Sequence, residues 1–149
     1  MNRWRFLCAG VTLLALCACA AQPQTSTPAT SAKLANLPCA EMGRETETMT
    51  IRYPAETLYQ NGAVLPKGTG LACLEALADG LSSVPLSRWQ ATVSAEGGYG
   101  FDPLQLAGKR QELLQRFFTR KGIEIKDWQW QTVADQGQQL QLVELKEKP

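Results

Sequence analysis

The sequence has 149 residues, with 15 basic residues, 14 acidic residues and no histidine, so its formal net charge is +1. This balance gives no basic surface of the kind that binds nucleic acid. The absence of histidine excludes Ser-His-Asp and Cys-His nucleophile systems and most zinc sites. A carboxylate-pair hydrolase needs no histidine, but the sequence singles out no such pair, so we expect a non-enzyme without metal or cofactor.

The first 18 residues have the pattern of a secretory signal. Arg3 and Arg5 precede residues 6–18, which are almost entirely apolar. This stretch is shorter than the roughly 20 apolar residues needed to cross a bilayer. A basic start, a short apolar run and a small-residue end are typical of a signal peptide. We therefore expect residues 1–18 to be removed, which leaves 13 basic and 14 acidic residues, a net charge of −1.

The apolar stretch ends in the run Leu16-Cys17-Ala18-Cys19, which resembles the lipobox of bacterial lipoproteins. There an aliphatic residue, a small residue and Ala or Gly precede the cysteine that is lipidated. The resemblance implies lipidation of Cys19, because a start at Cys17 would put Leu16 where a small residue is expected. The alternative is an ordinary signal peptide with a chance cysteine. Ala20, in place of Asp, implies an outer-membrane lipid anchor facing the periplasm.

The residues after Cys19 divide into a linker and a domain. Residues 20–38 are rich in Ala, Thr, Ser, Pro and Gln and carry a single charge, Lys33. Such a composition does not bury a core. We therefore expect the lipidated cysteine and a flexible linker over residues 19–38, and one globular domain over residues 39–149.

Two cysteines fall within the expected domain. Cys8 and Cys17 would leave with the signal and Cys19 would carry lipid, so Cys39 and Cys73 remain. In an oxidising periplasm two remaining cysteines usually pair. We therefore expect a Cys39–Cys73 disulfide, with two separate buried thiols as the alternative.

The first half of the domain switches between strand and helix periodicity. Residues 47–53 alternate, with Met49, Ile51 and Tyr53 on one face, which predicts a half-buried strand. Residues 71–81 carry leucines at helical spacing and predict a helix lying on a sheet. Residues 87–94 alternate again and predict a second strand.

Residues 103–121 carry the strongest helix prediction. Asp102 is a favourable N-cap, and Pro103 suits the first helical turn. Gly122 follows as an expected C-cap.

Two further strands close the predicted domain. Trp128 and Trp130 point the same way on the first of them, either into the core or onto the surface. Residues 140–145 form the second after a turn at Gln136-Gly137. The order is β-α-β-α-β-β, which favours parallel pairing within the strand–helix–strand units and a hairpin of the last two strands.

This order and two stretches of residues resemble the OmpA C-terminal-like, peptidoglycan-binding family. The first stretch, LYQNGAVLP at residues 58–66, is similar to that family's exit from its first strand. The second, residues 106–110 (LAGKR), is similar to its second-helix signature, where Arg precedes Gly-Ile by twelve residues, as Arg110 precedes Gly122. The resemblance covers residues 46–145 and implies an α+β fold, an OmpA-like sandwich of two helices on a four-stranded mixed sheet.

The resemblance also implies a ligand, the diaminopimelate side chain of the peptidoglycan stem peptide, which offers a carboxylate and an ammonium. Arg110 matches the family's cation, and a planar guanidinium can donate two hydrogen bonds to one carboxylate. The family's Thr-Asp pair is absent and Ala95 stands at its position, so Glu96 is the candidate acid, with Asp102 as a second. The alternative is that Arg110 is a solvated or ion-paired helix residue and Glu96 an ordinary loop acid.

Two functions follow from the resemblance. The first is an outer-membrane lipoprotein that binds peptidoglycan non-covalently and tethers the layers of the envelope. The alternative is an OmpA-like subunit of an envelope secretion or conjugation assembly, which contacts other proteins and does not bind peptidoglycan. Exposure of both Trp128 and Trp130 would favour this alternative.

Overall fold

The computed structural model describes residues 33–45, 48–84, 88–97, 100–135 and 137–146. The expected signal peptide, the expected lipidation site Cys19 and the turn residue Gln136 lie outside these residues. Within them, no helix combines the length and the hydropathy needed to span a membrane.

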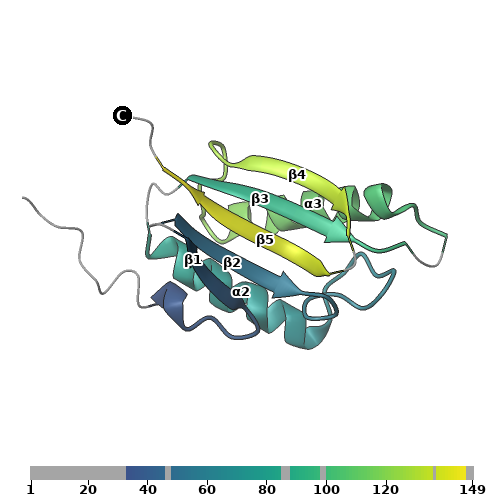
Figure 1. The fold of residues 1–149 in the computed structure, drawn as a ribbon, viewed down its shortest axis with the longest axis horizontal. Helices are drawn as coiled ribbons and strands as arrows, with labels where there is room; N and C mark the ends of the chain where they lie inside the picture. The colour runs from purple at the N-terminus through teal and green to yellow at the C-terminus, as the bar shows by residue number, and fades with distance from the viewer. Residues whose placement is uncertain (1–32, 46–47, 85–87, 98–99, 136, 147–149) are drawn as a thin grey trace, which may run out of the picture.

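The domain is an α+β sandwich, as predicted (Figure 1). Its elements are β1 (Glu41–Glu45), β2 (Thr48–Pro54), α2 (Gly68–Ser82), β3 (Arg88–Ala95), α3 (Pro103–Arg120), β4 (Gln129–Ala134) and β5 (Gln138–Leu145). The strands form one sheet in the order β1-β2-β5-β3-β4. The β3–β4 pair is parallel and the other three pairs are antiparallel, so the sheet is mixed.

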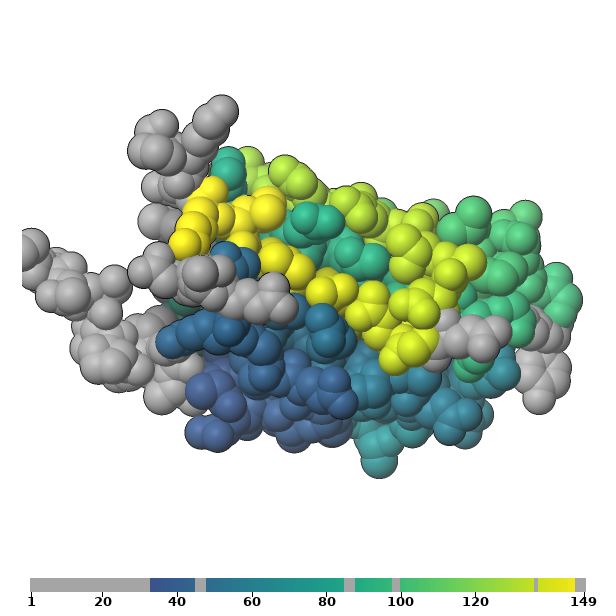
Figure 2. All heavy atoms as spheres, in the orientation of Figure 1, coloured from purple at the N-terminus to yellow at the C-terminus, as the bar shows by residue number. Residues whose placement is uncertain are grey.

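Both helices lie on one face of the sheet, with α2 behind β1 and β2 and α3 behind β3 and β4 (Figure 1). The opposite face, seen in Figure 2, shows the strands side by side with no described helix over them. The strand side chains that alternate toward the helices are buried and form the sheet half of the core: Met49, Ile51, Tyr53, Trp89, Ala91, Val93, Leu140 and Leu142. The predicted apolar faces of β2 and β3 are therefore confirmed.

The sheet has five strands, so the prediction of four was wrong in this detail. The additional strand, β1, pairs antiparallel with β2, with Met42 opposite Ile51. Its sequence, EMGRE, has one large apolar residue and a glycine and gives no alternating signal. An edge strand of this kind is held by backbone pairing to its neighbour, which sequence periodicity does not reveal.

The predicted hairpin of the last two strands is also wrong. β5 runs between β2 and β3, and β4 pairs in parallel with the outer side of β3. The short connection from β4 to β5 therefore passes the end of β3, where the Asp135 N–H donates to the Ala95 carbonyl at 3.3 Å. Proximity in sequence suggested a hairpin, but each strand found its pairing partner elsewhere.

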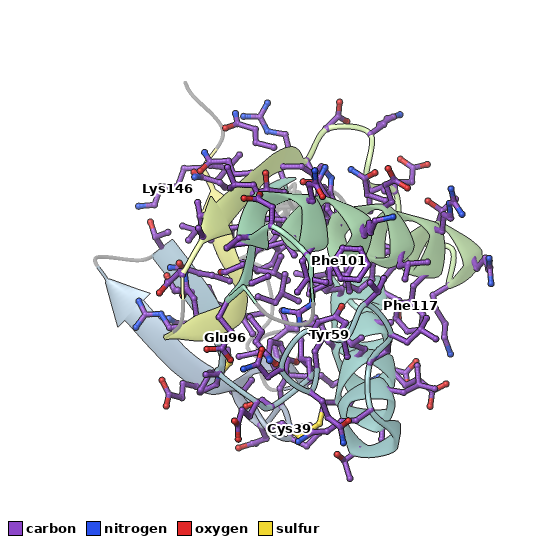
Figure 3. The ribbon with its side chains drawn as sticks, turned by 90° about the vertical axis from the view of Figure 1, so that its right-hand side faces the viewer. Cys39, Tyr59, Glu96, Phe101, Phe117 and Lys146 are labelled. Atoms are coloured by element: carbon purple, nitrogen blue, oxygen red, sulfur yellow. A yellow bond between two sulfur atoms is a disulfide. The ribbon has the colours of Figure 1, made fainter. Side chains whose placement is uncertain are left out.

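The packed part of the domain begins before Cys39, where the expected linker was placed. Leu34 is 1% exposed and Leu37 is 8% exposed, and both belong to the main core. The expected Cys39–Cys73 disulfide is present and joins the segment before β1 to α2 (Figure 3). The two cysteines are thus not separate thiols.

Candidate functional site

The candidate site lies at the end of the sheet where β2 and β3 finish. Both strands run antiparallel to β5, so they point the same way and the loops that follow them emerge together. These loops lead into α2 and α3, so both helices also begin at this end (Figure 1). The topology therefore collects residues from separate parts of the sequence at one place.

Arg110, about two turns into α3, is only 1% exposed. Its Nε donates to the Ala63 carbonyl at 2.9 Å, its Nη1 to Ser94 at 3.1 Å and its Nη2 to Gln60 at 3.4 Å. The guanidinium carbon lies 4.3 Å from the ring centroid of Tyr59, a cation–π geometry. Arg110 therefore ties the β2–α2 loop to the end of β3, and the alternative of a solvated helix residue is wrong.

The guanidinium keeps some capacity for a further partner. It carries about five N–H donors, and the three carbonyls account for one donor each. Burial lowers the pKa of Arg110, while Tyr59 and Glu96 act in the opposite direction. The two N–H groups that these carbonyls do not take can donate to the carboxylate of a ligand that reaches them.

The sequence analysis did not predict the side chain that holds the Tyr59 backbone in place. Gln139, near the start of β5 and 5% exposed, accepts from the backbone N–H groups of Leu58 and Tyr59 at 2.7 and 2.9 Å. Its Nε2 donates in return to the Tyr59 carbonyl at 2.9 Å. No local signal distinguishes this glutamine from its neighbours Gln138 and Gln141, because its partners lie about eighty residues earlier in the chain.

Glu96, the candidate acid, lies at this end of the domain, one residue after β3. Figure 3 looks onto this end, with Tyr59 near the centre and Glu96 and Phe101 on different sides of it. Glu96 is half-buried, and its negative charge partly opposes the lowering of the Arg110 pKa that burial causes. The ion pairs of the described residues do not include these two, and no group of three metal-binding side chains occurs among those residues.

Asp102 has a structural role at the start of α3. It is the N-cap of α3, and its Oδ1 accepts from the backbone N–H groups of Leu104 and Gln105 at 2.9 and 3.2 Å. These two bonds satisfy helix donors that have no partner within the helix. The geometry therefore supports the capping role that the sequence predicted.

Trp128 and Trp130 belong mainly to the core. Trp128 is 7% exposed and lies 5.5 Å from the ring of Phe118 and 5.6 Å from that of Trp130, measured between centroids. Trp130 is half-buried. The two tryptophans do not form an exposed aromatic face.

The exposed apolar side chains gather elsewhere. All four of the large apolar residues that are exposed in the described part of the chain lie just before or at the start of a helix: Leu65 and Leu71 at α2, and Phe101 and Leu104 at α3. Leu65 is 69% exposed and Leu104 is 52% exposed. Because both helices begin at the end that holds Arg110, this apolar set lies at the same end of the domain as the candidate site.

Comparison with solved structures identifies the class of fold. The domain is similar to a putative MotB-like protein from Desulfovibrio vulgaris, with 16% identity and a TM-score of 0.59, over 74% of this chain and 80% of the other. It is similar to the cell wall anchor of the T6SS from Pseudomonas aeruginosa, with 11% identity and a TM-score of 0.58, over 80% and 96%.

The OmpA-like domain of FopA1 from Francisella tularensis is a third similar structure, with 11% identity and a TM-score of 0.52, over 72% of this chain and 83% of the other. No protein-family model matches the sequence, and no curated protein matches it. The described domain therefore has the fold of these MotB-like and OmpA-like domains at low sequence identity, and the predicted fold resemblance is confirmed.

Proposed function

We propose that this chain is an outer-membrane lipoprotein whose OmpA-like domain binds peptidoglycan non-covalently and tethers envelope layers. The observation that supports the proposal is the presence of a buried Arg110 and a half-buried Glu96 at the same end of an OmpA-like fold. The run that ends in Cys19 supports the lipid anchor. The known neighbours of this fold include a cell wall anchor, which supports a role at the wall.

The proposed contacts follow from charge. Arg110 would receive the carboxylate of the stem-peptide diaminopimelate, and Glu96 would receive its ammonium. The contact from Arg110 to the Gln60 carbonyl is the longest of the three, at 3.4 Å. A carboxylate that displaced this carbonyl would gain a charge-assisted bond, so we expect the loop around Gln60 to move when the ligand binds.

Co-sedimentation of the purified mature chain with peptidoglycan tests the proposal. Glu96→Gln should weaken binding, since a neutral amide attracts an ammonium less strongly, and Glu112→Gln is the matched control because Glu112 is an exposed residue of α3. Arg110→Ala should weaken binding by roughly 30-fold to a few thousand-fold, equivalent to about 2–5 kcal/mol. Since Arg110 also braces a loop, circular dichroism must show that this variant folds.

The anchor has its own test. Cys19→Ala should abolish labelling with radioactive fatty acid and leave the protein free in the periplasm or uncleaved at the inner membrane. Labelling of Cys19→Ala equal to that of the wild type would contradict a lipidated Cys19.

The exposed apolar set favours a second candidate function, that of a subunit in an envelope assembly. Apolar side chains are exposed at the end of the domain where a ligand would bind: Leu65, Leu71, Phe101 and Leu104. Exposed apolar area collected in one place is typical of a protein contact. The low exposure of Arg110 points the same way, because carbonyls of this chain already occupy part of its guanidinium.

Photo-crosslinking in intact cells separates the two candidates. A photoreactive residue at Leu65 or Leu104 should give an adduct with a protein if the second candidate is correct, while the same group at Lys126, beyond the opposite end of α3, should give none. A folded wild-type chain that fails to sediment with peptidoglycan would remove the first candidate, and equal crosslinking at all three positions would remove the second.

A further inference from the structure

The described chain begins with a segment that lies against α2, residues 33–40, which we call the N-terminal strap (Figure 1). It starts with one helical turn, at residues 33–35, and runs into β1. Leu34 and Leu37 are buried and belong to the same core cluster as Leu77 and Leu81 of α2. The strap is therefore packed onto the domain through two side chains.

Gly80 makes room for the strap on α2. A Cβ at this position would lie 2.7 Å from Leu34 Cδ2 and 3.4 Å from Leu37 Cδ2. Glycine is unfavourable inside a helix because of its conformational freedom. Its presence here, two residues before the last residue of α2, is explained by the close approach of the strap.

The disulfide fixes the other end of the strap to the same helix. Cys39 is bonded to Cys73, which lies seven residues before Gly80 in α2. Seven residues are about two helical turns, so Cys73 and Gly80 lie on one face of α2, about 10 Å apart. The strap thus runs along α2 in the opposite direction to the helix and is attached at both points.

β1, the strand that follows the strap, is attached to the domain less firmly than the strap itself. β1 begins two residues after Cys39, and within the described residues it pairs with β2 alone. A hairpin pulled from its free end opens one hydrogen bond at a time, and each single bond resists little. Any pull that reached β1 from the preceding chain would therefore peel it away from β2.

We propose that the N-terminal strap and the Cys39–Cys73 disulfide form the attachment through which the domain carries tension. A pull from residues 20–32 passes through the strap and the disulfide into α2, and it does not reach the β1–β2 pair. This inference rests on the proposed tethering function, because a domain fixed to both a membrane and the wall carries tension along this route.

Force measurement on a single molecule tests the inference. The mature chain is held by peptide tags at its two ends in an optical trap and stretched with and without a reductant. The oxidised chain should unfold in one main event. The reduced chain should first show an early event at lower force that releases the strap and β1, residues 33–45, a gain of roughly 45 Å at about 3.3–3.6 Å per residue.

Two controls make the result specific. Leu34→Ala weakens the strap but leaves the disulfide, so it should keep the single event when oxidised and lower the force of the early event when reduced. Hydrogen exchange on the reduced chain should accelerate at those β1 amides whose N–H groups are bonded to β2, and not at Leu140 and Leu142 of β5.

A reduced chain that unfolds in one event, even at a lower force, overturns the inference, because the disulfide would then stabilise the domain only as a whole. An oxidised chain that already shows the early event overturns it as well. The measurement uses neither lipid nor peptidoglycan, so its outcome is separate from that of the wall-binding test.

Discussion

Arg110 shows how a charged side chain is accommodated in the interior of this domain. Removing a guanidinium from water is costly unless polar groups replace the lost solvation. Here three backbone carbonyls and the face of Tyr59 supply that replacement. The residue that the resemblance selected as a ligand contact therefore also holds the β2–α2 loop, and both roles depend on the same charge.

Tyr53 allows a test of whether a single buried hydroxyl makes a hydrogen bond. Its side chain is fully buried, and its hydroxyl has no hydrogen-bond partner among the described residues. A buried hydroxyl without a partner costs about 1–3 kcal/mol. Tyr53→Phe should therefore leave the free energy of unfolding unchanged or raise it, as measured by urea denaturation. A loss of more than about 1 kcal/mol would mean that the hydroxyl makes a hydrogen bond.

The buried tyrosines also predict a response to alkaline pH. Burial raises the pKa of both Tyr53 and Tyr59 above the ordinary value for tyrosine. Above about pH 10 the unfolded chain loses these phenolic protons while the native domain retains them. The unfolded state then binds fewer protons, so the free energy of unfolding should fall as pH rises. Urea denaturation between pH 8 and pH 11 should show this fall, and Tyr53→Phe should make it shallower.

At the scale of elements, α3 is the part that local sequence specifies best. Asp102 caps its first turn, Pro103 occupies its first position, and the helix ends at Arg120 before Gly122, close to the predicted limits. Its buried residues Arg110, Leu114 and Phe118 then pack it against β3 and β4. Capping and packing agree on the same helix.

The cap can be tested apart from its charge. Asp102→Ala should lower the free energy of unfolding by about 1 kcal/mol, because two backbone N–H groups lose their acceptor. Asp102→Asn should lose far less, since asparagine caps about as well as aspartate. If Asp102→Asn retains stability but loses peptidoglycan binding, Asp102 acts as a ligand-binding acid, and its assignment as a cap alone is incomplete.

At the scale of the whole molecule, the last strand of the sequence is the centre of the sheet. β5 pairs with β2 on one side and with β3 on the other, so it joins the two halves of the domain. β1 pairs with β2 alone and forms an edge. The two ends of the domain sequence therefore contribute unequally to its cooperativity.

This inequality predicts the outcome of two truncations. A chain that ends at Gly137 lacks β5 and should not fold, because β2 and β3 lose their shared partner and the core loses Leu140 and Leu142. A chain that starts at Thr48 lacks the strap and β1 and should keep a folded but less stable core. Near-ultraviolet circular dichroism and urea denaturation distinguish these states, and a folded chain without β5 would contradict the central role of that strand.

The sequence by itself determined the helices, the buried faces of β2 and β3 and the disulfide partners. These features depend on local periodicity, capping chemistry and the small number of available cysteines. Tertiary structure alone decided which strands β4 and β5 pair with, the addition of β1 and the packing of Leu34 and Leu37. It also decided the hydrogen bonds between Gln139 and the β2–α2 loop. These features depend on which surfaces, distant in the sequence, fit together. The free energy of such contacts cannot be calculated from any single segment of the chain.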